Sequence, residues 1–160
     1  MKVTFGPRGI LMIDNARIIY RNFSGIGSKF NREGDKNFSV VIDDQKIADS
    51  LIQDGWNLKI KPPRDEDDIP FMYLPVKLKF NDRGPNVYLE SGKNRIKLDE
   101  ESISCLDNVD IVNVDLDIRP YDWEVNGKTG RTAYLQSMCV TQEVDRFAKQ
   151  YAEEEYPEEW

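Results

Sequence analysis

Histidine is absent from this chain of 160 residues, and cysteine occurs only twice. Without histidine, the sequence excludes a Ser-His-Asp triad, a histidine general base and a histidine metal ligand. Cys105 and Cys139 each stand alone, without the closely spaced second cysteine of a zinc site. Two cysteines are also too few for a disulfide framework, which favours a reducing compartment. We therefore expect two buried structural cysteines, and no metal or cofactor.

Long apolar runs are missing as well. No stretch approaches the ~20 consecutive apolar residues of a membrane helix. Residues 1–7 lack the apolar core of a signal peptide. With 39% hydrophobic and 32% charged residues, the composition is typical of a water-soluble domain that is large enough to bury a core. The sequence therefore predicts a cytoplasmic protein without membrane contact.

Motifs for nucleotide or metal chemistry are incomplete. Gly127-Lys128-Thr129 matches the end of a phosphate-binding P-loop, but Asp122 stands where the first glycine is required. The acidic run 65–68 offers hard oxygen ligands but lacks the spacing and the glycine of a calcium loop. Asp115 and Asp117 alternate with apolar residues, as expected on the solvated face of a strand. We expect no catalytic residues, and the protein is not predicted to be an enzyme.

Residues 109–142 form the most strongly patterned part of the sequence. Val114, Leu116 and Ile118 alternate with charged residues, which indicates a strand with one buried face. After Pro120 the apolar residues move to odd positions, which suggests a bulge or a bend at the proline. A second strand-like run, 131–142, follows an Asn-Gly turn at positions 126–127. The sequence predicts a long hairpin with a basic tip.

Shorter strands and one helix account for the rest of the body. Asp44 is a suitable N-cap and Gly55 a suitable C-terminal residue for a helix over 45–54. The strand-like segments outside the hairpin are 17–23, 36–42, 56–61, 76–80, 87–89 and 95–98. Their short connections favour antiparallel pairing. We predict a mostly β fold with α additions, arranged as a small antiparallel barrel or sandwich with a long β-hairpin extension and one internal helix.

Charge is distributed unevenly along the chain. The formal net charge is −7, and residues 143–160 contribute −5 of it, which leaves −2 for residues 1–142. Such asymmetry between body and tail favours two functional parts. We predict a single domain over 1–142, followed by an acidic tail over 143–160 that is helical and then disordered.

Cations interleaved with aromatic residues are the strongest functional signal in the body. Binding a single nucleic-acid strand requires a positive groove for the phosphates and flat side chains on which bases stack. Exposed lysines on strands and aromatic residues in a core are ordinary features, but here they coincide in four segments. The predicted DNA-binding residues are Arg21, Phe23, Lys29, Phe30, Arg32, Lys59, Lys61, Lys77, Lys79, Trp123, Lys128, Arg131 and Tyr134.

The last nine residues, 152–160, run Ala-Glu-Glu-Glu-Tyr-Pro-Glu-Glu-Trp. This segment resembles the acidic tail, ending in an aromatic residue, of bacterial and phage single-stranded DNA-binding proteins. With its β-rich body, the chain resembles a phage-type single-stranded DNA-binding protein of the OB-fold class. The resemblance implies a five-stranded barrel whose sheet face and loops hold the strand. It also implies that Glu158, Glu159 and Trp160 bind replication or recombination proteins.

Two classes of function remain as alternatives. The first is sequence-independent binding and protection of single-stranded DNA in phage or mobile-element replication and recombination, in the cytoplasm of a bacterial host. The second is a β-rich structural or assembly protein of a phage particle that binds no nucleic acid. A nuclease is disfavoured by the missing histidines. Homodimer formation and the preference for DNA or RNA stay open at this point.

Overall fold

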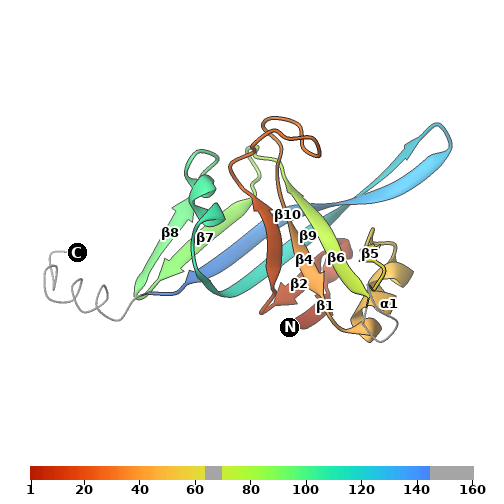
Figure 1. Cartoon of the computed structure of the whole chain (residues 1–160), viewed down its shortest axis with the longest axis horizontal. Helices are drawn as coiled ribbons and strands as arrows, with labels where there is room; N and C mark the ends of the chain where they lie inside the picture. Colours follow the sequence, from red (N-terminus) through yellow and green to blue (C-terminus); the bar gives the residue numbers. More distant parts are fainter. Residues whose placement is uncertain (64–69, 145–160) are drawn as a thin grey trace, which may run out of the picture.

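The computed structural model describes residues 1–63 and 70–144 (Figure 1). Within these residues, one α-helix and ten strands make the fold mostly β with a small α component. The strands are β1 (Lys2–Phe5), β2 (Leu11–Asp14), β3 (Ile18–Asn22), β4 (Lys36–Ile42), β5 (Lys59–Lys61), β6 (Phe71–Leu78), β7 (Asn86–Ser91), β8 (Asn94–Leu98), β9 (Ile111–Val125) and β10 (Lys128–Gln142). The helices are α1 (Gln45–Asp54) and two 3₁₀ turns, η1 (Pro7–Gly9) and η2 (Ser102–Asp107).

All ten strands belong to one sheet, whose main path is β1-β2-β9-β10-β6-β4-β3. Strand β10 is its centre, because it pairs antiparallel with β9 and parallel with both β6 and β7. The hairpin β7–β8 and the short strand β5 branch from this path. Strand β3 at one end of the path follows directly in the chain after β2, the second strand from the other end. The backbone N–H of Ala16, between β2 and β3, donates to the carbonyl of Val114 on β9. The sheet therefore curls round a core, although its ladder of strands is not closed.

The core lies inside this curled sheet. Alternate residues of the strands point into it, as expected for strands with one buried face. The largest fully buried side chains include Phe23, Phe38, Leu11, Ile13, Ile42, Met72, Leu74, Ile103, Leu106, Ile118 and Met138. Two of them, Ile103 and Leu106, come from η2, which packs beside β3.

The predicted helix is confirmed with its bounds. The carboxylate of Asp44 accepts hydrogen bonds from the backbone N–H groups of Lys46 (2.8 Å) and Ile47 (3.4 Å), as an N-cap residue does. Gly55 ends the helix at a φ of 100°, a left-handed conformation that favours glycine. The helix buries Ala48 and Leu51 and packs against β4.

The predicted long hairpin is confirmed, with a turn at Asn126 and Gly127. It projects from the body as the blue arm at the right of Figure 1. The predicted bulge at Pro120 is wrong: β9 pairs without interruption there, and the extra residue is Gln136 of the partner strand. The phase change has another cause. The apolar side chains of β9 change from the inner face to the outer one, where Tyr121 and Trp123 are exposed.

Other bounds differ from the prediction. The strand expected over 56–61 begins only at Lys59, and the strand expected over 76–80 begins earlier, at Phe71. Pro75 lies within β6, opposite Ser39 of β4, so the strand accommodates a proline. The acidic run 65–68 and nearly all of the predicted tail lie outside the described residues. No helix in the described part of the chain is long and apolar enough to cross a membrane.

Candidate nucleic-acid interface

The two lysine-rich strands of the sequence lie side by side. In the ladder between β5 and β6, Lys59 is opposite Tyr73 and Lys61 is opposite Phe71. Directly opposed residues share a face, and so do alternate residues of one strand. Lys77 is therefore on the same outward face as both β5 lysines. Pairing β5 with β6 thus gathers predicted cations that are widely separated in the sequence.

A groove of ≈ 610 Å³ lies beside this face. One wall is the loop between β3 and β4, and the other is the outer side of β4 and the end of β6. Five predicted DNA-binding residues line it: Phe30, Arg32, Lys77, Lys79 and Tyr134. Lys29 lies next to it, with its ammonium group 5.8 Å from the centre of the Phe30 ring. The groove therefore combines cations with aromatic rings, as single-strand binding requires.

The ring of Phe30 is the most exposed aromatic side chain at the site. It is 91% exposed, at the tip of a loop held by hydrogen bonds between the backbones of Ser28 and Asn31. The side-chain amide of Asn31 fixes the same loop by donating to the carbonyls of Ile26 and Asp35. An exposed apolar ring on an ordered loop is available for stacking on a base.

The hairpin continues the same face. Tyr134 is opposite Lys77 on β6 and opposite Arg119 on β9, whose guanidinium lies 5.5 Å from the centre of the Tyr134 ring. Farther out, Trp123 is opposite Gly130, and a Cβ atom at Gly130 would overlap its indole ring. The glycine thus leaves room for the indole ring to pack close to the backbone of β10. Lys128 is in the same alternation at the tip.

A second aromatic cluster lies near the β5 end of this face. The ammonium group of Lys61 donates to the hydroxyl of Tyr20 (2.9 Å) and lies over the rings of Tyr20 and Tyr73. These two rings meet edge to face at 5.5 Å between centroids. Phe71 packs on Tyr73 at 5.7 Å. Tyr20 reaches this position at a φ of 53°, within an irregular stretch of the β3–β4 pairing.

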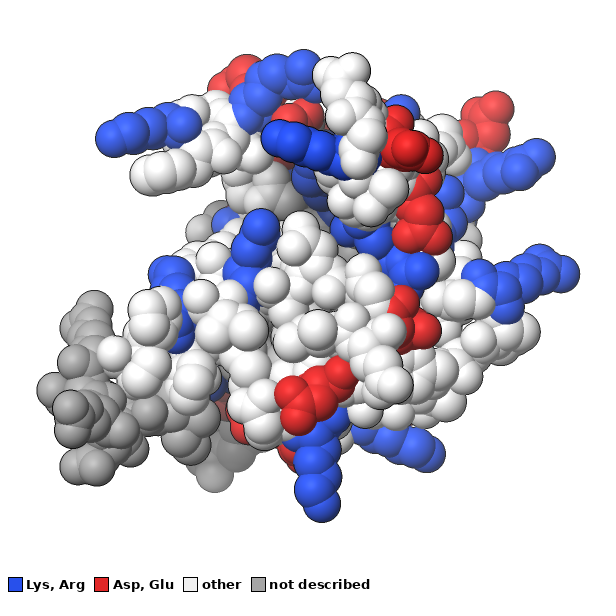
Figure 2. Space-filling model, turned by 90° about the vertical axis from the view of Figure 1, so that its right-hand side faces the viewer, with Lys and Arg blue, Asp and Glu red and all other residues white. Residues whose placement is uncertain are grey.

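Charge at the groove is mainly positive. Among residues 1–63 and 70–144, Lys36, Lys77 and Lys79 form no ion pair, and Arg32 has only a long contact of 3.7 Å with Asp35. Glu100 and Asp35 are the acidic residues of the lining. Figure 2 shows the end of the molecule at which the hairpin projects, hollowed between an upper and a lower part, with basic side chains on both sides of the hollow. The acidic overall charge therefore does not prevent a locally basic surface.

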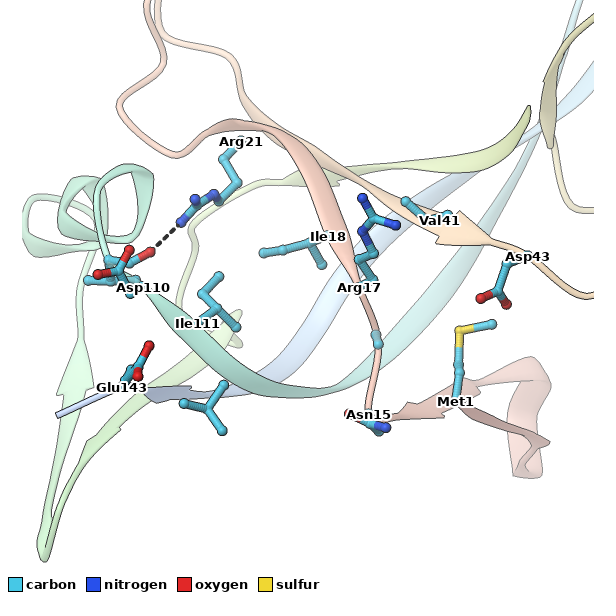
Figure 3. Close-up of a pocket in the computed structure, with 13 residues that line it drawn as sticks. Met1, Asn15, Arg17, Ile18, Arg21, Val41, Asp43, Asp110, Ile111 and Glu143 are labelled. Atoms are coloured by element: carbon cyan, nitrogen blue, oxygen red, sulfur yellow. Dashed lines mark hydrogen bonds between the residues drawn. The ribbon is translucent and has the colours of Figure 1, made fainter. Parts of the chain in front are cut away.

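Three of the predicted DNA-binding residues do not belong to this surface. Phe23 is fully buried and stacks on Phe38 at 5.3 Å, so the prediction that it stacks on bases is wrong. Arg21 donates to the backbone carbonyls of Leu106 (2.9 Å) and Val109 (2.8 Å). Figure 3 shows Arg21 reaching across a separate pocket toward the segment that follows η2. Its guanidinium stabilises the fold and is not in the groove.

Arg131 is the third exception. It is opposite Asp122, in the alternation that faces away from Trp123. Its guanidinium donates to the Asp122 carboxylate (2.7 Å) and to the backbone carbonyl of Asp54 (2.7 Å), and it lies 5.1 Å from the centre of the Trp56 ring. The hydrogen bond from Arg131 lowers the pKa of the Asp122 carboxyl. Arg131 therefore ties the hairpin to the end of α1 and does not face the groove.

Sequence reasoning missed two residues of this surface. Lys36 lines the groove, and Tyr73 lies beside Lys61. Alternation along 71–79 could have placed Phe71, Tyr73 and Lys77 on one face. The position of Tyr20 depends on an irregular strand pairing that no local pattern reveals.

The cysteines also differ from expectation. Cys105 is exposed and Cys139 is half-buried, so the prediction of two buried cysteines is wrong. Partial desolvation nevertheless raises the pKa of both thiols, which reduces the reactive thiolate. Within the described ranges, no three His, Cys, Asp or Glu side chains are grouped as metal ligands.

The sequence matches a known protein family over nearly its whole length. The family described as “Putative phage ssDNA-binding domain” matches residues 2–159. The chain belongs to this family. The resemblance inferred from the sequence is thereby confirmed. So is the expectation of a non-enzymatic protein, because this phage ssDNA-binding domain family is one of binding domains rather than catalysts.

Solved structures with a similar fold include the single-stranded DNA-binding protein from bacteriophage Enc34. It has a TM-score of 0.58 and 13% identity, over 91% of this chain and 87% of that one. The same phage protein in complex with ssDNA has a TM-score of 0.57 and 16% identity, over 91% and 93%. At identities of 13% and 16%, this similarity concerns the fold alone. No curated protein sequence matches significantly.

Proposed function

We propose that this protein binds single-stranded DNA without sequence preference, along the outer face of β4, β6 and the β9–β10 hairpin. The observation that carries the proposal is the groove in which Phe30, Arg32, Lys77, Lys79 and Tyr134 meet. Lysine and arginine hold the phosphates, and aromatic rings accept the bases by stacking. Every base has a flat face, so such contacts discriminate little between sequences.

The strand order supports an OB-type arrangement. In an OB-fold, the face of the second and third strands and the loops after the first and fourth bind oligonucleotides. We assign β2 with β3 as the first strand, and β4, β6, β9 and β10 as the second to fifth. Phe30 and Arg32 then lie in the loop after the first strand, and the hairpin tip is the loop after the fourth. On this assignment, the proposed groove corresponds to the surface with which OB-folds bind oligonucleotides.

Family membership favours this function over that of a phage structural protein. We further propose that residues 1–142 form the DNA-binding domain and that the acidic residues 143–160 recruit replication or recombination proteins through Glu158, Glu159 and Trp160. The location in this proposal is the cytoplasm of a bacterial host. The composition of the tail supports recruitment, since five glutamates and the aromatic residues Tyr156 and Trp160 follow position 152. Homodimer formation stays a prediction, which sedimentation of the free protein would check.

Titration of the full chain with oligo-dT at about 50 mM salt tests the function. We expect binding at micromolar protein and a steep loss of affinity as salt rises, because phosphate contacts release counterions. Other single-stranded sequences of equal length should bind with similar affinity, and a matched duplex should bind more weakly. Absence of a mobility shift with every single-stranded oligonucleotide at that salt would refute the proposal.

A further inference from the structure

A second basic pocket opens beside the groove. Its volume is ≈ 630 Å³ and it lies between η1, the turn that follows β6, and the base of the hairpin. Four cationic side chains line it, with neutral residues between them: Arg8, Lys79, Arg83 and Arg119. Three of these four, the arginines, are not among the residues predicted from the sequence to bind DNA.

Two tight turns hold two of these arginines in place. Arg8 is the middle residue of η1 and has a φ of 61°, and the turn is closed by the N–H of Gly6 donating to the carbonyl of Ile10 (2.8 Å). A Cβ atom at Gly9 would lie 3.2 Å from the ring of Pro120, so this turn packs closely on β9. Arg83 lies in a turn closed by two backbone hydrogen bonds between Asn81 and Gly84. Arg8 and Arg83 therefore both lie in turns that backbone hydrogen bonds hold in a defined conformation.

The charge of the pocket is unbalanced. Among residues 1–63 and 70–144, no carboxylate lines it and none of its four cations forms an ion pair. The guanidinium of Arg119 lies 5.5 Å from the centre of the Tyr134 ring. Four cations placed together without counterions repel one another, so this arrangement is more stable when an anion lies among them.

The pocket is continuous with the groove. Lys79 lines both, and Tyr134 in the groove contacts Arg119 in the pocket. A polyanion that leaves the groove past Tyr134 therefore meets Arg119 next. The two parts differ in chemistry, since Phe30 and Tyr134 line the groove, whereas no aromatic ring of the described residues lines the pocket.

We propose that this pocket is a phosphate-holding extension of the single-strand site, occupied only when the bound strand is long enough to pass the groove. The inference rests on the proposed function. Arg8, Arg83 and Arg119 contact backbone phosphates, for which the planar guanidinium is well suited. Bases of the same nucleotides point to solvent, because nothing in the pocket stacks on them.

A ladder of oligo-dT lengths, from about 4 to about 16 nucleotides, tests the inference across the range of site sizes of OB folds. The test variant is Arg8→Gln with Arg83→Gln, which leaves the groove intact. The matched control is Arg95→Gln with Lys97→Gln on β8, which removes the same charge from residues that line neither pocket. We expect the test variant to bind the shortest bound oligonucleotide as the wild type does. It should lose affinity for the longest, with the slope of log affinity against log salt reduced by about 1.4, or about 0.7 per phosphate contact.

The other outcomes overturn the inference in distinguishable ways. If the test variant loses nothing at any length, or loses equally at all lengths, the pocket is not an extension of the strand path, while the proposed function stands. If the wild type binds no length, the proposed function fails and the inference fails with it. A second variant, Arg119→Gln, guards against a folding defect in the first. It should reproduce the length dependence while near-ultraviolet circular dichroism remains that of the wild type.

Discussion

At the scale of single residues, Phe30 carries the clearest functional prediction. Its ring is 91% exposed on an ordered loop at the rim of the groove, so it contributes little to the packed core. Stacking on a base is worth about 1–3 kcal/mol, and Phe30→Ala should therefore weaken oligo-dT binding about 5- to 140-fold. The salt slope should not change, because no charge is removed. A fluorescence titration at several salt concentrations measures both quantities.

The matched control for Phe30 is Ile96→Ala. Ile96 is 53% exposed on β8 and lines neither the groove nor the basic pocket. Its removal should leave affinity unchanged. Equal affinities of Phe30→Ala and the wild type, with both proteins folded, would exclude stacking by this ring.

At the scale of elements, the hairpin depends on Arg131. Its side chain is 20% exposed and joins Asp122 on β9 to the end of α1 at Asp54. The Asp122 side chain is 67% exposed, so solvent screens this pair, and Arg131→Gln should lower the free energy of unfolding by about 1 kcal/mol. The salt slope of DNA binding should stay unchanged, because Arg131 faces away from the groove. Arg95→Gln, which removes an exposed pair with Glu90, should change stability by less than about 0.5 kcal/mol.

The same pair predicts a dependence on pH. Arg131 lowers the pKa of Asp122 below its ordinary value of 3.8, so the stabilisation is fully present at neutral pH and is lost as pH falls through the folded-state pKa. The difference in stability between wild type and Arg131→Gln should therefore narrow in strong acid. Urea unfolding at pH 7 and below pH 3.8 measures it. A difference that is constant over this range would contradict the assigned pair.

Local patterns were sufficient to predict some elements of this fold. Asp44 and Gly55 mark α1 because capping is a matter of a few adjacent residues, and the Asn-Gly turn marks the hairpin for the same reason. The pairing of β5 with β6 and the parallel pairing of β10 with β6 involve residues far apart in the sequence, so no periodicity reveals them. The candidate site could be predicted only in part for the same reason, because its residues come from segments far apart in the sequence.

Phe30 and Lys77 could be proposed from the sequence because basic and aromatic residues lie near them. Phe23 has basic and polar neighbours too, yet it is buried while Phe30 is exposed. Burial is set by tertiary packing, which a local pattern does not contain. The pocket of Arg8, Arg83 and Arg119 could not be predicted, because its residues come from three separate segments: η1, the turn after β6, and the base of the hairpin.

At the scale of the whole molecule, the acidic tail should compete with DNA for the basic surface. The tail, residues 143–160, has a net charge of −5 and is covalently attached to the body. A tethered competitor acts at a high effective concentration, and its attraction is strongest at low salt, where screening is weak. Removal of residues 145–160, which keeps the backbone hydrogen bond from Glu143 to Asp110, should tighten oligo-dT binding at low salt. The gain should shrink as salt rises.

A full-length variant separates charge from chain length in that experiment. Replacing Glu153, Glu154, Glu155, Glu158 and Glu159 by Gln removes most of the acidic charge and keeps the length. It should tighten binding as truncation does. Removal of Trp160 alone should leave DNA affinity nearly unchanged and abolish capture of a partner protein. A folded truncated protein that binds no better than wild type at low salt would contradict the competition.

We propose that the phosphates of a bound single strand lie along the outer face of β6 and the residues that follow it. The most direct test is the slope of log affinity against log salt in a variant that lacks a pair of lysines from this face. The comparison is Lys77→Ala with Lys79→Ala against Lys46→Ala with Lys97→Ala, which removes equal charge from α1 and β8, outside the groove. With oligo-dT, the slope of the first variant should fall by about 1.4, since each phosphate contact contributes about 0.7. The slope of the second should equal that of the wild type. Identical slopes in the two variants would show that the strand does not follow β6.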